Sequence, residues 1–154
     1  MTEVSFLVLG LPVQQGSKNA WVNPHTGKAV MVEKTGRRLK DWRADIKIAF
    51  LAATSSQQRD TMVRERNAVS LTVVFAFPRP ASHYGSGKNA DRLKGSAPES
   101  HVQTPDLDKL LRSVLDALTG VAYLDDRFVD GISACRVWAS DLHPPGASIN
   151  LQWA

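Results

Sequence analysis

Five aspartates gather within about twenty residues of this chain: Asp106, Asp108, Asp116, Asp125 and Asp126. They make up a third of the 15 acidic side chains in a protein of 154 residues with a net charge of +4. Two carboxylates about 4 Å apart repel by roughly 4 kcal/mol at an effective dielectric constant near 20, so a convergent group needs a neutralising proton or cation. A hard divalent cation, which prefers carboxylate oxygens, is the natural partner.

The chemistry that such a group favours is phosphodiester hydrolysis. Mg²⁺ takes few carboxylates, keeps several waters and accepts phosphate oxygens from a substrate. A metal-bound water or hydroxide can attack phosphorus while the cation and a nearby guanidinium neutralise the growing charge. We therefore predict a pocket of three carboxylates for Mg²⁺ from Asp106, Asp108 and Asp126, with Asp125 beside them and Arg112 as the nearby cation.

One amphipathic helix is expected to position most of these side chains. Thr104 is its predicted N-cap, Pro105 its first helical residue and Gly120 its stop. Its apolar stripe has helical spacing and consists of Leu107, Leu110, Leu111, Val114, Leu115 and Leu118.

The placement of the acidic residues follows from this helix. Asp108 and Arg112 are four residues apart and share its polar face, whereas Asp106 can join them only from the start of the helix, where backbone N–H groups favour anions. Asp126 completes the pocket only if the strand after it runs beside that end of the helix. Taken singly, Asp106 and Asp108 are also typical of helix capping, and Asp125 and Asp126 of a turn.

The remaining sequence predicts an α+β fold in one domain over residues 1–154, with a mixed sheet of about four to five strands and two main helices. Alternating apolar residues predict strands at 4–9, 69–77, 128–139 and 149–153, the last at a sheet edge. Residues 21–22 and 29–32 flank a turn-forming run and predict a hairpin. A second apolar stripe predicts a helix over 35–53; it consists of Leu39, Trp42, Ile46, Ala49, Phe50 and Ala53.

Residues 81–103 have no apolar periodicity and lead directly into the acidic motif. Compact domains rarely keep loops longer than about 12–15 residues unless these are functional or disordered. We predict a mobile loop that becomes ordered when substrate binds.

Positive charge is concentrated in the first hundred residues, which carry fifteen Lys and Arg against eight Asp and Glu. Together with a pI near 9.5, this indicates a polyanionic partner, although solubility alone would also explain it. The predicted nucleic-acid contacts are Lys18, Arg37, Arg38, Lys40, Arg43, Lys88, Arg92, Lys94 and Lys109. For the cations of the 35–53 helix, a solvated helix face is the alternative.

Several classes of protein are excluded or disfavoured. The single cysteine, Cys135, rules out an internal disulfide and a thiolate-rich zinc site, and it is expected to pack as a small apolar side chain. No phosphate-cradling G-x-x-x-x-G-K-[ST] loop supports a nucleotide cofactor, and an EF-hand starting at Asp106 fails at Leu110 and Leu111. With neither a signal segment nor a membrane span in the sequence, we expect a cytoplasmic protein without a membrane partner.

Two further residues have alternative interpretations. His101 is the histidine nearest the motif; we interpret it as a solvated loop residue, with a proton shuttle as the alternative. Trp21, near the predicted hairpin, is interpreted as a core residue, with stacking on an exposed base as the alternative.

The run PDLDKLLR at 105–112, followed by DALTG at 116–120 and the pair Asp125-Asp126, resembles the RusA family of Holliday junction resolvases. The resemblance implies a small α+β homodimer that uses Mg²⁺, with Mn²⁺ as a substitute, to nick opposed strands of a four-way DNA junction. It places the catalytic aspartates at Asp106, Asp108 and Asp126.

Two positions depart from the family pattern. The family usually has asparagine where Lys109 stands and, in its best-known form, lysine where Arg112 stands. Arginine is effectively never deprotonated in proteins, so Arg112 acts by electrostatics or positioning and not as a general base. Lys109 either weakens cation affinity or holds a phosphate.

Three functions are compatible with these sequence features. The first is a Mg²⁺-dependent, structure-selective endonuclease acting on branched DNA. The second is a non-catalytic DNA-binding protein whose acidic patch is structural or contacts a partner. The third is a nuclease that prefers RNA or flap substrates at the same metal site.

Overall fold

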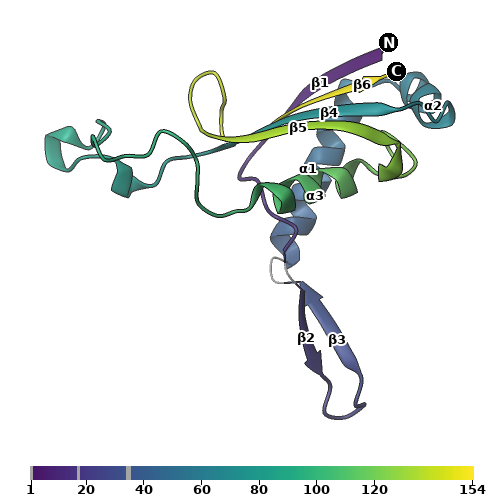
Figure 1. Ribbon diagram of the computed structural model, residues 1–154, viewed down its shortest axis with the longest axis horizontal. Helices are drawn as coiled ribbons and strands as arrows, with labels where there is room; N and C mark the ends of the chain where they lie inside the picture. Colours follow the sequence, from purple (N-terminus) through teal and green to yellow (C-terminus); the bar gives the residue numbers. More distant parts are fainter. Residues whose placement is uncertain (1, 17, 34–35) are drawn as a thin grey trace.

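Four strands form one mixed sheet in the order β1-β6-β4-β5, and two more form a separate hairpin (Figure 1). The computed structural model describes residues 2–16, 18–33 and 36–154. The strands are β1 (Thr2–Leu9), β2 (Lys18–Val22), β3 (Ala29–Glu33), β4 (Val69–Phe77), β5 (Val129–Trp138) and β6 (Gly146–Trp153). The helices are α1 (Gly36–Ala53), α2 (Ser56–Arg64) and α3 (Leu107–Leu118). The predicted α+β fold with a small mixed sheet and two main helices is confirmed.

The central strand β4 shows how sequence pattern produces the sheet. Its alternate residues Val69, Leu71, Val73 and Phe75 are buried, while Thr72 faces outward. β4 pairs antiparallel with β6 and parallel with β5. A parallel pair needs a crossover, and here the chain leaves β4, forms α3 and returns along β5. The chain therefore connects both ends of α3 to strands of the sheet.

Helices α1 and α3 pack on the core side of the sheet. Leu39, Ile46 and Phe50 of α1 are fully buried, as are Leu110 and Leu118 of α3. Burying each such side chain contributes about 1.5–3 kcal/mol. These contacts place α1 against β1 and α3 against β5 on one face of the sheet, with the two helices packed against each other.

The sequence prediction for β6 was wrong in one respect. β6 was expected at an edge, but it lies between β1 and β4 and pairs antiparallel with both. Its burial pattern, with Ala147, Ile149, Leu151 and Trp153 facing the core, resembles that of an edge strand with one buried face. Strand order depends on long-range pairing that this local pattern does not encode.

The helix α2 was not predicted. Only Met62 of its nine residues is buried, so it has no apolar stripe. A capping box begins it: Ser55 Oγ accepts from Gln58 N at 3.1 Å, and Gln58 Oε1 accepts from Ser55 N at 2.8 Å. The S-x-x-Q pattern was the available sequence signal.

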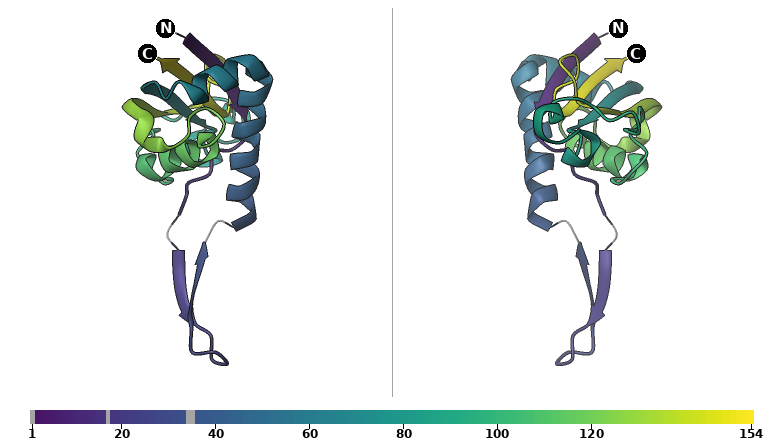
Figure 2. Two further views of the ribbon diagram at one scale, coloured as in Figure 1. Left: turned by 90° about the vertical axis from the view of Figure 1, so that its right-hand side faces the viewer. Right: turned by 90° about the vertical axis from the view of Figure 1, so that its left-hand side faces the viewer.

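The β2–β3 hairpin projects beyond the end of α1, away from the sheet (Figure 2). Trp21 is 48% exposed and Val22 is 64% exposed. The interpretation of Trp21 as a core residue was therefore wrong, because the hairpin lies outside the core.

Residues 81–103 extend from the sheet as a long connection with two 3-10 turns, Ala81–His83 and Gly87–Asn89 (Figure 1). Tyr84 and Leu93 form an isolated bridge within this connection. Ordering of the loop on substrate stays a prediction.

Two further observations concern the rest of the chain. Cys135 of β5 is exposed, which corrects the expectation that it packs as an apolar side chain. Within the described ranges, no helix combines the length and the apolar character that crossing a bilayer requires.

Candidate active site at the N-terminal end of α3

The motif helix starts later than predicted. Leu110 N donates to Asp106 O at 3.0 Å, which makes Asp106 the N-cap, with an extended backbone at φ −72° and ψ 138°. The prediction of Thr104 as N-cap and Pro105 as first helical residue was therefore wrong by two positions. The correction places Asp106 at the start of the helix and Asp108 in its first turn.

The carboxylate of Asp106 occupies the capping position without capping the helix, since it accepts no hydrogen bond from the first turn. It forms an ion pair with Lys109, with Nζ and Oδ2 3.1 Å apart, and its side chain is 49% exposed. Asp108 is also exposed. The first N–H groups of a helix lack intrahelical partners and attract anions. This end of α3 therefore combines two accessible carboxylates, one ammonium group and a backbone suited to phosphate.

The segment after β1 holds the start of α3 from one side. Gln14 Oε1 accepts a hydrogen bond from Asp106 N at 2.9 Å, and Gln15 N donates to Lys109 O at 3.0 Å. These contacts join residues about ninety positions apart in the chain. They fix the backbone that carries Asp106 and Asp108.

Arg136 of β5 holds the approach to α3 from the other side. Its guanidinium donates to the carbonyl oxygens of Gln103 and Pro105, each at 2.8 Å. Hydrogen bonds from a charged donor contribute about 1.5–3 kcal/mol each in buried settings and less where exposed. Arg136 therefore positions the motif, and no feature of the local sequence had indicated this role.

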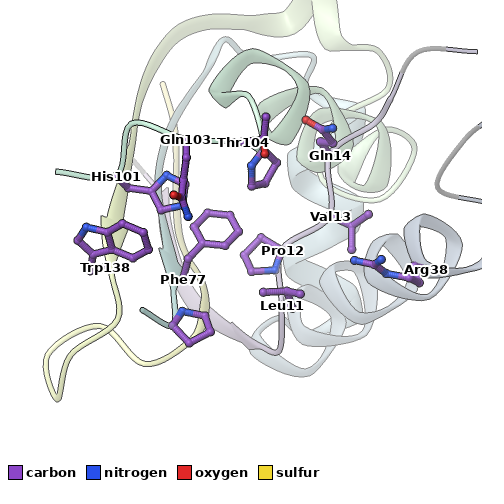
Figure 3. Close-up of a pocket in the computed structure, with 12 residues that line it drawn as sticks. Leu11, Pro12, Val13, Gln14, Arg38, Phe77, His101, Gln103, Thr104 and Trp138 are labelled. Carbon is purple, nitrogen blue, oxygen red and sulfur yellow. The ribbon is translucent and has the colours of Figure 1, made fainter. Parts of the chain in front are cut away.

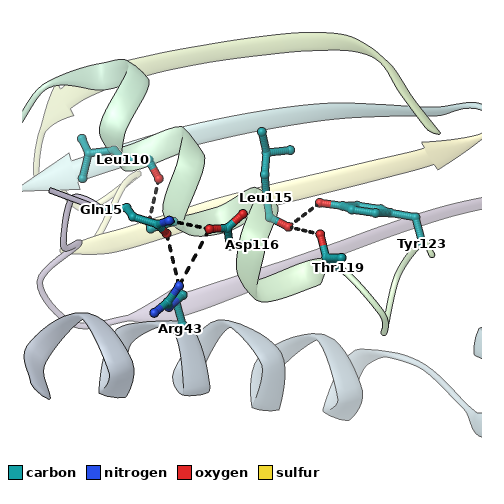
Figure 4. A network of polar contacts seen from close by, with 8 residues as sticks. Gln15, Arg43, Leu110, Leu115, Asp116, Thr119 and Tyr123 are labelled. Carbon is teal, nitrogen blue, oxygen red and sulfur yellow. Dashed lines mark hydrogen bonds and ion pairs between the residues drawn. The ribbon is translucent and has the colours of Figure 1, made fainter. Parts of the chain in front are cut away.

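Asp116, two turns further along α3, is neutralised by the protein itself (Figure 4). Its carboxylate accepts a hydrogen bond from Gln15 Nε2 and lies 3.8 Å from Arg43 NH1 of α1. Arg43 also donates to Gln15 Oε1 at 3.3 Å. Arg43, predicted to contact nucleic acid, thus has a structural partner in the described chain.

Tyr123 marks the C-terminal end of α3. Its buried hydroxyl donates to Leu115 O at 2.9 Å. Burial raises the pKa of Tyr123 well above its ordinary value. A hydrogen bond with Thr119 opposes this less strongly, and the carboxylates of Asp126 and Asp116 raise the pKa further by smaller amounts. The phenol therefore stays protonated. The effect of Asp126 on this pKa also indicates that its carboxylate lies near Tyr123, at the C-terminal end of the helix.

The pair Asp125-Asp126 lies in the turn between α3 and β5. Asp125 Oδ1 accepts from Arg127 N at 3.0 Å and caps the 3-10 turn Asp126–Phe128, so its side chain has the turn role that was the alternative interpretation. This turn follows the C-terminal end of α3 (Figure 1), whereas Asp106 precedes the N-terminal end. A helix of 12 residues is about 18 Å long.

Among the residues that the structure describes, no group of three or more His, Cys, Asp or Glu is placed to hold a metal ion. Asp106 and Asp108 stand at the N-terminal end of α3, whereas Asp126 follows its C-terminal end and, like Asp116, lies near Tyr123. Two carboxylates still suit Mg²⁺, which usually takes one or two of them and completes its shell with water and substrate phosphate. The donors at the N-terminal end of α3 therefore fit the cation in chemistry and number.

The predicted cations have varied surroundings. Arg112 is exposed one turn after Asp108. Those exposed on α1 and on the 81–103 connection are Arg37, Arg38, Lys40, Lys88, Arg92 and Lys94. Their contact with nucleic acid stays a prediction. The side chain of Lys18 lies outside the described residues.

A pocket beside the start of α3 was also missed (Figure 3). It has a volume of about 390 Å³, and Thr104 and Pro105 form part of its wall. His101, interpreted from the sequence as solvated, is only 4% exposed because it packs against Phe77 and Trp138. These contacts join three distant segments, so the local sequence contained no signal for them.

Comparison with known proteins agrees with the motif. A family model described as Endodeoxyribonuclease RusA matches residues 12–152. Among curated proteins, no relative matches the chain. The family match covers α3, the turn before β5 and the basic helix α1.

Proposed function

The chain belongs to the RusA family of endodeoxyribonucleases, and from that premise we propose that it is a Mg²⁺-dependent nuclease that resolves four-way DNA junctions. The reaction is the paired hydrolysis of phosphodiesters in opposed strands. Mn²⁺ substitutes for Mg²⁺, because both accept carboxylate oxygens and water.

One observation carries this proposal. Asp106 stands at the N-cap of α3, yet its carboxylate does not cap the helix, and Asp108 lies exposed in the next turn. A capping aspartate would contribute about 1 kcal/mol to stability, so using this position otherwise has a cost. The two carboxylates are thus available for a ligand beside a helix end that favours phosphate.

The residues at this end have distinct roles in the proposal. Asp106 and Asp108 hold the cation, which when bound polarises the phosphoryl group and lowers the pKa of water. Arg112 remains charged throughout and stabilises negative charge that develops on phosphate oxygens. Lys109, 3.1 Å from Asp106, orients that carboxylate before substrate binds and can move to a phosphate oxygen.

A homodimer suits this reaction. Cutting two strands symmetrically requires two sites related by a two-fold axis, which an isologous interface provides. Asp126, with Asp125 beside it, remains the proposed third ligand. Because Asp126 follows the far end of α3 in one chain, a second copy of the chain can supply it to the site.

The substrate range separates the candidate functions. Purified protein is incubated with labelled four-way, flap and linear DNA and with RNA, with and without Mg²⁺. The proposal expects paired, symmetric nicks in the four-way junction that need Mg²⁺. Cleavage confined to flaps or RNA would support the third candidate function and contradict junction resolution.

A matched pair of variants tests the site. Asp108→Asn should abolish cleavage while junction binding persists or tightens. Binding does not weaken because asparagine, unlike the carboxylate, does not repel the DNA phosphates. Asp60→Asn is the control, since Asp60 is an exposed aspartate of α2 in a surface ion pair of 3.9 Å with Arg64. Unchanged cleavage in Asp108→Asn would place the active site elsewhere, whereas binding without any cleavage by the wild type would favour a non-catalytic DNA-binding protein.

A further inference from the structure

The pocket beside the start of α3 has an aromatic wall. The imidazole of His101 lies with its centroid 4.6 Å from the Phe77 ring and 4.5 Å from the Trp138 ring. Arg79 lies over the same indole at 5.1 Å. Figure 3 shows these three rings at one end of the pocket and Arg38 at the other. The wall offers the exposed parts of these rings, which are only 4–8% of each residue, and the far end offers a cation.

Two buried nitrogen atoms in this wall lack hydrogen-bond partners within the described part of the chain. They are His101 Nδ1 and Trp138 Nε1, on side chains only 4% and 8% exposed. Leaving such a group unsatisfied costs about 1–3 kcal/mol, so proteins rarely do it without reason. Both residues also line an adjoining cavity of about 530 Å³. Because both atoms are shielded from solvent, a bound molecule with polar edges would reach them only after the rings turn towards it.

At the aromatic wall, the neutral imidazole of His101 favours a heterocycle over a phosphate group. Burial lowers the pKa of His101, and the cationic Arg136 lowers it further. The ring is therefore neutral near pH 7 and offers one donor and one acceptor, as a nucleobase edge does. A volume of about 390 Å³ lies within the range of pockets that bind small ligands.

We propose that this pocket binds one nucleobase that leaves the base stack at the branch point of the DNA substrate. This inference rests on the proposed function and concerns how the nuclease site selects its substrate. Pro105 lines the pocket and directly precedes Asp106, so a base held there brings the phosphate of its own nucleotide towards the start of α3. Extruding a base costs least where pairing is already weakened, which favours a branch point over a continuous duplex.

The test compares binding to junctions that differ by one base. Fluorescence anisotropy measures Kd in EDTA for an intact four-way junction, for one with an abasic nucleotide at the branch point, and for one with an abasic nucleotide within an arm. Stacking on aromatic side chains is worth about 1–3 kcal/mol per base, so the branch-point abasic junction should bind about 5- to 150-fold more weakly. The arm abasic junction should bind like the intact one.

Two variants connect this preference to the pocket. His101→Ala should reduce the difference between intact and branch-point abasic junctions to less than about threefold, whereas His25→Ala, on the exposed hairpin turn, should keep it in full. Circular dichroism melts establish that each variant is folded. If His101→Ala does not fold, Gln103→Trp, at an exposed position on the pocket rim, replaces it and should likewise reduce the difference by obstructing the pocket.

The outcomes separate this proposal from the nuclease assignment. Equal affinity of the wild type for the intact and branch-point abasic junctions would overturn the base pocket, even if Mg²⁺-dependent cleavage is observed. A folded pocket variant that keeps the full preference would overturn it as well. A preference that depends on His101, in a protein that never cleaves, would support the pocket and contradict the nuclease.

Discussion

The two ends of α3 both carry aspartates, but the protein treats them differently. At the C-terminal half, Asp116 accepts a hydrogen bond from Gln15 and pairs with Arg43. At the N-terminal end, Asp106 pairs with Lys109 of the next turn and does not cap the helix. Asp116 therefore has a structural role, and Asp106 and Asp108 are available for a ligand.

Gln15 connects the two ends. Its side chain contacts Asp116, while its backbone N–H donates to Lys109 O. The network at one end thus braces the backbone that carries the reactive end. The number of aspartates in a motif therefore does not separate the structural carboxylates from those proposed to be catalytic; the partners of each carboxylate do.

The largest effect is expected for Asp106→Asn. Loss of a carboxylate that holds the cation should lower the rate of junction cleavage in Mg²⁺ by about a thousandfold, since a metal ion supplies several kcal/mol of transition-state stabilisation. Thermal stability should hardly change, because the side chain is 49% exposed and does not cap α3. Single-turnover cleavage and a melting curve measure both. A large loss of stability with normal cleavage would reverse the roles of the two ends.

Arg112 should show the next largest effect. Arg112→Gln removes a positive charge beside the reacting phosphate and should reduce cleavage by about a hundredfold. Arg112→Lys keeps the charge and should retain most of the activity. If Arg112 acts only through charge, neither variant should shift the pH dependence of the cleavage rate. A rate that follows the titration of lysine in Arg112→Lys would instead indicate proton transfer at this position.

At the other end of the helix, Asp116→Asn should affect stability and spare catalysis. It removes a partly exposed ion pair with Arg43, so the free energy of unfolding should fall by about 1 kcal/mol. Junction cleavage should stay within a few-fold of the wild type. Urea unfolding and the cleavage rate, measured on the same preparation, test this. A cleavage loss equal to that of Asp106→Asn would end the distinction between the two ends.

The smallest effect concerns His101. Burial and the neighbouring Arg136 lower its pKa from 6.5 in the folded chain. As the pH falls below 6.5, the unfolded chain takes up a proton first, so the wild type loses stability until the pH passes the folded pKa. The His101→Gln variant should not lose this stability in acid, because glutamine does not take up a proton. Urea unfolding between about pH 8 and about pH 5 should show the two stabilities diverging in acid, whereas parallel curves would contradict a lowered pKa.

Elements with strong apolar periodicity could be predicted from the sequence. β4 alternates over nine residues, and α1 and α3 repeat at three and four, so their existence followed from local pattern. The start of α3 was misplaced because Thr104 and Pro105 are themselves typical helix-start residues. The backbone hydrogen bond from Leu110 N to Asp106 O makes Asp106 the N-cap, and the sequence does not show this bond.

The site was only partly predictable for a similar reason. Asp108 and Arg112 follow from their spacing on one helix, and Asp106 follows from its position at the start of that helix. Arg136 and the pocket around His101 depend on contacts between β5, the end of β4 and the connection before α3, and no local pattern encodes those contacts.

The proposed function depends above all on a divalent cation held at the N-terminal end of α3. Electron paramagnetic resonance of Mn²⁺ tests this directly, by counting bound ions in the protein with a non-cleavable four-way junction. We expect Asp116→Asn to bind Mn²⁺ like the wild type, whereas the double variant Asp106→Asn/Asp108→Asn should lose the bound ion while still holding the junction. Undiminished Mn²⁺ binding in the double variant would show that the cation lies elsewhere.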